Sequence, residues 1–328
     1  MGGVSTDAGA PGRRVVLDTD LGTDVDDALA LALLLGSPEV ELLGVTTVYG
    51  DTDLRARATS RLLELAGVPG PGAPGGLPVR AGASAPLSGA EVWWAGHEGT
   101  LLGDLTTATT TAPAPGSAAA DDAADWLAAT AAAAPGAVDL LAIGPLTGVA
   151  TALRRHPELA RHLRSLVVMG GRWDGALTAD GLLEDEHNLR SDAVAAAEVL
   201  TCGAQTLVVG LEVTQRVRLE AGDVERIAAA GPLGAALAAQ VRQWWEFWDE
   251  PWGVPHDPVT ALVLLEPDVL QLGPPGRVEV DGRGAVVHVP DPAGTVRVAV
   301  GVDAQRAAEA VVRRVLAGCR RSAEQERA

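Results

Sequence analysis

The sequence contains no lysine. All 25 of its basic residues are arginine, against 43 aspartates and glutamates, and the formal net charge is −18. Without lysine the chain can form no Schiff base and no phosphate-loop motif. Its acidity and its lack of a basic tract argue against binding to nucleic-acid polymers or anionic membranes, because their phosphates would be repelled. The acidity is then either a diffuse solubility feature or a concentrated site.

Cysteines, aromatic residues and long apolar runs are also scarce. Cys202 and Cys319 are the only cysteines, far apart and too few for a disulfide framework, so we expect free thiols and a cytoplasmic protein. Aromatic residues make up 3% of the chain, and eight of the ten are tryptophan. Apolar runs such as 28–35 are far shorter than the roughly 20 residues of a membrane span. We expect no membrane association.

The length of 328 residues is enough to bury a large core. The first residues are small and polar, with no apolar segment that would mark a secretory signal. Two stretches rich in Pro, Gly, Thr and Ala look like surface loops rather than linkers between domains. We therefore expect one domain over residues 13–320, with a disordered leader over 1–12 and a disordered tail over 321–328.

Strand and helix patterns alternate along the chain without hairpin dipeptides between them. The pattern predicts a strand at 14–20, a helix at 26–35, a strand at 41–51 and a helix at 53–67. Such alternation indicates an α/β fold, with an open, mostly parallel sheet flanked by helices and a Rossmann-like core. Further strands are predicted at 137–144, 165–171 and 205–213, further helices at 120–134, 147–160, 190–201, 222–249, 257–266 and 304–317, and a small antiparallel edge at 277–301.

The most concentrated acidity lies between the first strand and the first helix, where residues 18–27 read DTDLGTDVDD. In a parallel sheet this junction is the carboxyl end of a strand, where ligands bind. Asp24 can cap the helix, and Asp26 and Asp27 suit its dipole, for roughly 0.3–1 kcal/mol each. Those effects do not explain Asp18 and Asp20. Crowded carboxylates either take up protons or hold a cation, and all-oxygen donors favour Ca²⁺ or Mg²⁺.

Two other metal-binding motifs have a similar pattern of aspartates. An EF-hand loop needs a glutamate eleven residues after its first aspartate, where this chain has Leu29. A phosphatase of the haloacid-dehalogenase type also opens with a strand and an Asp-x-Asp. It usually needs a later lysine, which is absent here, although an arginine could replace it. A metal-dependent phosphatase therefore stays open as an alternative.

Nine short segments, which begin with the acidic cluster, follow one another in a recognisable order. They are DTDLGTDVDDALAL (18–31), TTVYGD (46–51), AGASAPL (81–87), AGHEG (95–99), GPLTGVATAL (144–153), VVMGG (167–171), Glu186-His187-Asn188, GLEVT (210–214) and His256-Asp257-Pro258. In this order they resemble the inosine–uridine-preferring nucleoside hydrolase family. The resemblance implies hydrolysis of the N-glycosidic bond of a small-molecule ribonucleoside, giving free base and ribose, and a role in nucleoside salvage.

The resemblance also implies a calcium site, with magnesium left open. Its ligands would be the carboxylates of Asp20, Asp26, Asp27 and Asp257 and the main-chain carbonyl of Ile143. Asp20 would also take a proton from the attacking water, and the transition state would resemble an oxocarbenium ion. His256 would lie near the leaving base and could protonate it. The residues expected at the substrate are Asp26, Asp51, His97, Met169, Glu186, His187, Asn188 and His256.

Some positions depart from the family pattern and leave alternatives open. The acidic cluster has two extra residues, so Asp24 is either a helix cap or a replacement ligand. Asp51 stands where asparagine is common, and His187 where phenylalanine is common. Helical spacing favours Trp244 and Trp248 as core residues, although a nucleobase needs such rings for stacking. The base and the sugar therefore stay open.

Two further possibilities concern the whole protein. It could bind a nucleoside or sugar in a metal-dependent way without turning it over. The resemblance implies a homo-oligomer, either a dimer or a tetramer.

Overall fold

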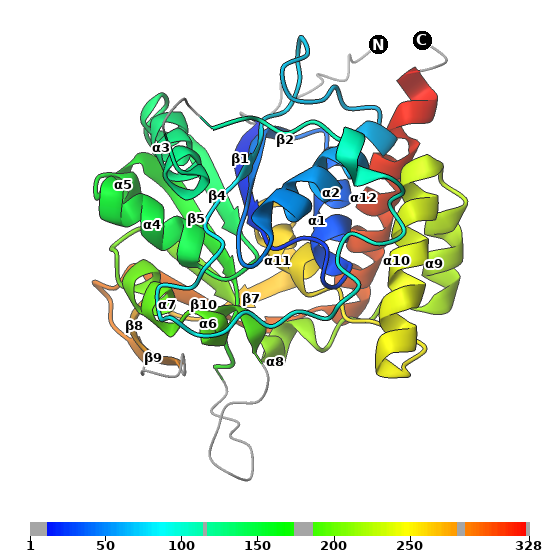
Figure 1. Ribbon diagram of the computed structural model, residues 1–328. Helices are drawn as coiled ribbons and strands as arrows, with labels where there is room; N and C mark the ends of the chain where they lie inside the picture. Colours follow the sequence, from blue (N-terminus) through cyan, green and yellow to red (C-terminus); the bar gives the residue numbers. More distant parts are fainter. Residues whose placement is uncertain (1–11, 114–116, 174–185, 281–285, 326–328) are drawn as a thin grey trace, which may run out of the picture.

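The computed structural model describes residues 12–113, 117–173, 186–280 and 286–325. One ten-stranded sheet runs through this part of the chain, with helices on both of its faces (Figure 1). The strand order is β3-β2-β1-β4-β5-β6-β10-β8-β9, and β7 pairs with β10. The α/β fold predicted from the alternating pattern is confirmed.

Seven neighbouring strands are parallel and form the body of the sheet. They are β1 (Arg13–Thr19), β2 (Val40–Thr47), β3 (Val79–Ala81), β4 (Val138–Ala142), β5 (Leu163–Met169), β6 (Thr206–Val209) and β10 (Val296–Val302). Side chains alternate across them, so Leu17 of β1 faces one core cluster while Val16 faces the other. Because both faces are covered, the strands read as apolar runs.

The antiparallel part is small and lies beyond β6. It consists of β7 (Leu270–Leu272), β8 (Gly276–Val280) and β9 (Val286–Pro290). β7 and β8 each pair with β10, and β9 pairs with β8. The predicted antiparallel edge at 277–301 is confirmed for β8 and β9. The last strand of that stretch, β10, has parallel pairing with β6 on one side and antiparallel pairing on the other, so it joins the two parts of the sheet.

Helices cover the two faces in separate groups (Figure 1). One face carries α1 (Asp26–Leu35), α2 (Thr52–Leu65), α9 (Ala221–Ala228), α10 (Pro232–Trp248), α11 (His256–Leu265) and α12 (Ala304–Gln325). The other carries α3 (Ala119–Ala132), α4 (Thr147–Arg155), α5 (Leu159–His162) and α7 (Ala193–Leu200). The short helices are α6 (His187–Ser191), α8 (Leu211–Thr214) and the 3₁₀ turns η1 (Leu105–Thr107) and η2 (Pro267–Val269).

Two predicted helices are divided in the structure. The helix predicted at 147–160 ends at Arg155, because the residue before Pro157 disfavours the helical conformation, and a second helix begins at Leu159. The helix predicted at 222–249 is interrupted at Gly231, whose φ of 128° is open only to glycine, and Pro232 starts the next helix.

The ends of the chain can be compared with the expected layout only in part. Nearly all of the expected leader, residues 1–11, lies outside the described residues, as do residues 326–328. The expected disordered tail over 321–328 is wrong for residues 321–325, because α12 continues to Gln325. That segment is rich in alanine, arginine, glutamate and glutamine, which favour helix.

Neither cysteine is paired, and Cys319 is buried. Within the described ranges no helix combines the length and the apolar character that a membrane crossing requires.

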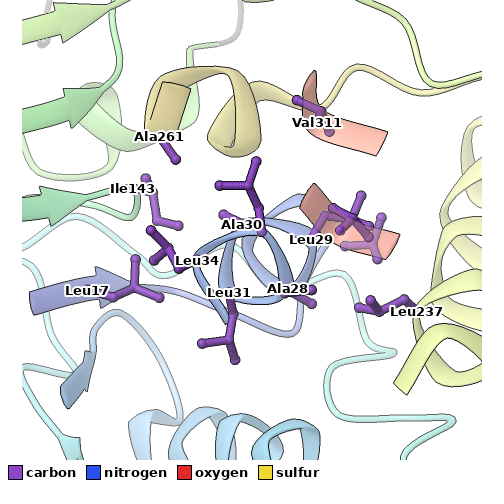
Figure 2. Close-up of a cluster of buried hydrophobic side chains, with 14 of the residues drawn as sticks. Leu17, Ala28, Leu29, Ala30, Leu31, Leu34, Ile143, Leu237, Ala261 and Val311 are labelled. Atoms are coloured by element: carbon purple, nitrogen blue, oxygen red, sulfur yellow. The ribbon is translucent and has the colours of Figure 1, made fainter. Parts of the chain in front are cut away.

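Helix α1 is buried on every side, which explains why its sequence, DDALALALLL, shows no polar face. Figure 2 shows Leu29 and Leu31 among the side chains that fill the space around it, together with Ile143 from the sheet side, Ala261 of α11 and Val311 of α12. The acidic first turn of α1 is therefore held by packing rather than by solvent-exposed contacts.

The C-terminal end of α1 crosses α12 at two glycines. A Cβ added to Gly36 would lie 1.9 Å from the carbonyl oxygen of Arg314, and one added to Gly318 would lie 2.1 Å from that of Ala32. Because neither residue has a side chain, the two helix backbones can approach each other this closely. The Arg314 guanidinium also donates to Ser37 Oγ at 2.8 Å, next to the crossing.

We expect Gly318→Ala to destabilise the protein by at least about 2 kcal/mol, because the new methyl group must push two backbones apart. Urea unfolding measures the change. Gly222→Ala in α9 is the control, since nothing lies within 4 Å of its added Cβ. That control should be neutral or stabilising by up to about 1 kcal/mol. Equal midpoints for wild type and Gly318→Ala would show that the helices have room to separate.

Candidate active site

A large pocket opens at the carboxyl edge of the parallel strands. Its volume is about 1050 Å³, and Asp20, Ile143 and Met169, at or just after the ends of β1, β4 and β5, contribute to its wall. Ligands in open α/β sheets bind at this edge, because the loops after neighbouring strands converge there. The position expected for the site from the sequence is therefore the position of the pocket.

The floor of the pocket is acidic. Residues 20–25, which we call the acidic loop, lead from β1 into α1, and Asp26 and Asp27 form the first turn of that helix. Asp24, Asp26 and Asp27 each offer a carboxylate oxygen, and these oxygens lie within 4.8 Å of one another. The N-cap of α1 is Val25, which makes no side-chain capping bond, so Asp24 is not the helix cap that the sequence allowed.

Asp257 joins the floor from a distant part of the chain. It lies in the first turn of α11, is buried, and its backbone N–H donates to Asp26 Oδ2 at 3.3 Å. Thr19 Oγ1 donates to Asp27 from the last position of β1. The structure thus brings together the carboxylates that the sequence pattern placed 231 residues apart.

Burial and mutual repulsion raise the pKa values of these carboxyl groups. Desolvation is the main cause for Asp24, Asp27 and Asp257, whose pKa values lie well above the ordinary range, and their acidic neighbours raise them further. The pKa of Asp26 is raised to about 6 by burial, although hydrogen bonds from Asp24 and the Asp257 backbone oppose the shift. A bound cation would offset this repulsion.

Asp18 lies behind the pocket rather than in its wall. One carboxylate oxygen accepts a hydrogen bond from Thr46 Oγ1, and the other has no hydrogen-bond partner although it is buried. Desolvation raises the pKa of Asp18 to about 7, and the charge of Asp20 adds to the shift. Asp18 therefore links the end of β1 to Thr46 of β2 and lies close to Gly148 at the start of α4.

Glu186 and Asn188 line the next part of the wall, at the start of α6. Glu186 is the N-cap and accepts from the backbone N–H groups of Asn188 and Leu189, each at 2.8 Å. Asn188 Nδ2 donates to the carbonyl oxygens of Ile143 at 2.7 Å and Met169 at 3.2 Å. The Ile143 carbonyl, expected as a metal ligand, thus already accepts one hydrogen bond and keeps its second lone pair.

His187 lies between these two residues and faces the acidic floor. Its Nε2 is 3.6 Å from Asp20 Oδ2, which is beyond normal hydrogen-bond distance. Its ring meets Tyr49 and Trp93 edge to face, at centroid distances of 5.2 and 5.9 Å. Desolvation alone would lower the pKa of His187, but interactions with Asp20, Glu186 and Asp24 together outweigh it and raise the pKa.

Much of the remaining wall is aromatic. Six of the ten aromatic residues in the chain line this one pocket: Tyr49, Trp93, Trp244, Trp245, Trp248 and Trp252. The interpretation of Trp244 and Trp248 as core residues is wrong, because both line the pocket and Trp248 is 55% exposed. Helical spacing correctly placed them on one face of α10. It could not show that this end of α10 faces the pocket.

His256 stands between the acidic and aromatic regions, as the first residue of α11. Its Nδ1 lies 2.7 Å from Thr214 Oγ1. Desolvation lowers the pKa of His256 to about 4, so the imidazole is neutral at pH 7. A neutral imidazole donates a hydrogen bond from one ring nitrogen and accepts one at the other. It does not carry the second proton that a general acid would transfer.

Asp51 and His97 do not line the pocket. Asp51 is exposed and caps α2 by accepting from the Leu54 backbone N–H at 2.9 Å. His97 Nε2 lies 2.7 Å from the carbonyl oxygen of Thr23, and its ring packs against Trp244 and Phe247. His97 therefore connects the acidic loop to α10 from behind the pocket wall.

Sequence reasoning missed three residues that shape the site: Tyr49, Trp93 and Arg55. Tyr49 has a left-handed backbone, with φ of 69°, a strained conformation for a bulky residue that only a structure reveals. Trp93 stands in a loop with no periodic pattern. Arg55 is buried beneath the acidic loop. In the sequence it is one of several arginines on a predicted helix, and nothing there distinguishes it from the others.

Residues 15–309 match the family model described as inosine-uridine preferring nucleoside hydrolase. The uridine nucleosidase 1 of Arabidopsis thaliana is 30% identical over 297 residues, which cover 87% of this chain and 84% of that protein.

Two solved structures agree with this assignment. A plant nucleoside hydrolase and the purine-preferring ribonucleoside hydrolase from Gardnerella vaginalis both superpose with TM-scores of 0.75, at 26% and 25% identity. The alignments cover 93% and 94% of this chain and 99% of each of those chains. The family match, the fold and the acidic pocket agree, and the chain belongs to the inosine–uridine-preferring nucleoside hydrolase family and is an enzyme of that class.

Proposed function

We propose that the acidic floor of the pocket holds one Ca²⁺ ion and that the enzyme uses it to hydrolyse ribonucleosides. The observation that carries the proposal is the cluster of Asp24, Asp26 and Asp27, whose carboxylate oxygens lie within 4.8 Å of one another in a pocket that Asp20 and Asp257 also line. Their donors are all oxygen, which suits a hard cation and not zinc. The carboxylates of Asp20, Asp26, Asp27 and Asp257 and the carbonyl of Ile143 would hold it, with Asp24 as a further candidate.

When bound, such an ion supplies positive charge that orients substrate oxygens and lowers the pKa of a nearby water. Asp20 is the proposed general base that accepts a proton from this water. Its position supports the role, because Asp20 lines the pocket at the end of β1 while its side chain remains only 9% exposed. A positioned base contributes about 10²–10⁴-fold to a rate.

The ribose would lie between the acidic floor and the start of α6. Glu186, Asn188 and Met169 line this side and would contact its hydroxyl groups and ring, and Asp26 could contact a hydroxyl group from the floor. The surrounding carboxylates would stabilise positive charge that develops on the sugar as the bond to the base breaks. His187, which faces Asp20, would contact the sugar from the same side as Tyr49.

The leaving base would lie against the aromatic wall. Indole rings stack on any flat heterocycle, so this wall suits purines and pyrimidines alike. His256 would provide a hydrogen bond to the base from its neutral imidazole. This proposal keeps His256 at the leaving group, but its lowered pKa favours a hydrogen-bonding role over that of an acid that is protonated at neutral pH.

Assembly into dimers or tetramers and a cytoplasmic location stay predictions from the family resemblance. Asp51 and His97, which were also predicted to contact the substrate, do not line the pocket. In this proposal they act only indirectly, through the loops that they hold in place.

Metal removal should abolish activity. After treatment with EDTA, the protein should release no ribose from uridine or inosine, and Ca²⁺ should restore release because it returns the missing charge. Binding should also raise the melting temperature, as expected for about 2.7 kcal/mol of stabilisation at 100 times the Kd. Phosphate esters are the parallel substrates, and they should release no phosphate. Full activity of a protein shown to be free of metal would contradict the proposal.

Asp20→Asn should lower kcat by about 10²–10⁴-fold, because the amide cannot accept the proton. Its unfolding midpoint in EDTA should not fall, since the change removes a buried charge. Asp139→Asn is the matched control: Asp139 is fully buried at the other end of the sheet and pairs with Arg13 and Arg164. The control should lose stability and keep its kcat. A kcat of Asp20→Asn within threefold of wild type would exclude the base role.

His256→Gln should lower kcat/KM about tenfold and leave the shape of its pH profile unchanged. Burial lowers the pKa of His256, so the proton is bound only as the pH falls through about 4, and the residue is neutral from pH 5 upward. The loss then reflects one hydrogen bond of about 1.5 kcal/mol. Steady-state kinetics between pH 5 and 9 measure the profile. Loss of a limb in that range in the variant would mean that His256 titrates there.

A further inference from the structure

One arginine lies directly beneath the acidic loop. Arg55, near the start of α2, is 1% exposed, and among the described residues it is the only buried arginine. Burial of a guanidinium is costly unless its N–H groups are satisfied, so its partners identify what it is for.

The hydrogen bonds of Arg55 converge on the backbone that carries the site. Nη1 donates to the carbonyl oxygens of Asp20 and, at 3.1 Å, Leu21, and Nη2 donates to Thr23 Oγ1 at 3.1 Å. Nε donates to the carbonyl oxygen of Tyr49 at 2.6 Å. No pairing with a carboxylate is needed to satisfy the group. The fork instead fixes the acidic loop and the strained residue Tyr49 to α2.

The same guanidinium also contacts a second loop. Its carbon lies 4.9 Å from the centroid of the Trp94 ring, within the range of a cation–π interaction. Trp94 belongs to residues 92–98, which we call the aromatic loop. Next to it, Trp93 lines the pocket, and the Trp93 backbone N–H donates to Tyr49 Oη at 2.8 Å.

The two loops also contact each other directly. His97 Nε2 lies 2.7 Å from the Thr23 carbonyl, and Glu98 keeps the aromatic loop folded by accepting from the backbone N–H groups of Ala95 and Gly96 at 2.6 and 2.7 Å. Arg55 therefore lies where the metal side and the substrate side of the pocket meet.

We propose that Arg55 is a positioning residue that sets the geometry of the acidic loop for the cation and couples it to the aromatic loop that contacts the substrate. The proposal rests on the calcium site proposed above. A planar fork with several donors is required, because one guanidinium must hold three backbone carbonyls and a hydroxyl while it lies over the Trp94 ring. A lysine has the charge but cannot make these contacts together.

The test is a set of variants whose Ca²⁺ affinity is measured by calorimetry on EDTA-treated protein. Arg55→Met keeps the apolar stem and should weaken Ca²⁺ binding at least tenfold. Arg55→Lys keeps the charge and should recover part of that loss, but KM should stay raised. Trp94→Leu should raise KM several-fold and leave the Ca²⁺ affinity within about twofold of wild type.

Arg80→Met is the matched control for a general loss of stability. Arg80 also lies over an indole, 5.7 Å from the centroid of Trp126, and pairs with Asp122 far from the pocket. It should lower the unfolding midpoint and leave both the Ca²⁺ affinity and KM unchanged. If Arg55→Met fails to fold, Arg55→Lys carries the comparison, with circular dichroism as the check of its fold.

The outcomes separate the two proposals. Wild-type affinity and KM in a folded Arg55 variant would overturn the role of Arg55 and leave the calcium site intact. Equal losses of Ca²⁺ affinity in the Arg55 and Arg80 variants would also overturn it, because stability alone would then explain the effect. A wild-type protein that binds neither Ca²⁺ nor Mg²⁺ would overturn the calcium site and, with it, the proposed role of Arg55.

Discussion

Repulsion among buried carboxylates is the constraint on which the rest of this structure depends. Asp24, Asp26, Asp27 and Asp257 meet at one end of the sheet, where burial and the charges of neighbouring carboxylates raise their pKa values. Packing must therefore hold them together. Helix α1 supplies that packing, because it is buried on every side, and α11 brings Asp257 against it. The stability of a large apolar core is used to keep a destabilised polar site in place, as is common where binding or catalysis needs strain.

The acidic floor and the aromatic wall of the pocket differ in chemistry and favour different kinds of group. The acidic floor favours positively charged groups, whereas the aromatic wall offers flat, weakly polar surfaces. Few aromatic residues are used elsewhere in the chain, since only Trp126 and Trp173 pack in the second core cluster. The general core is built from leucine, valine and alanine instead. Aromatic residues are thus scarce in the chain as a whole but concentrated around the pocket.

The sequence predicted the acidic floor better than the aromatic wall, for physical reasons. The Asp cluster is local, and its place between a strand and a helix follows from the rules of parallel sheets. Strand and helix types were correct for most long elements, while Pro157 and Gly231 divided two helices that a periodic pattern alone could not interrupt. Trp248 and Arg55 depend on which way a helix face points and on contacts across distant loops. Periodicity gives the spacing of side chains on one helix but not what faces them.

The crossing of α1 and α12 has a consequence for how the protein is made. The Ser37 and Arg314 side chains that meet there are separated by 277 positions, and the Asp26 and Asp257 contact spans 231. On the ribosome the acidic loop emerges early, long before either partner exists. During that time the nascent chain carries a cluster of uncompensated negative charge beside an apolar helix without its cover. The site is therefore complete only after most of the chain, including Asp257 and α12, has been synthesised.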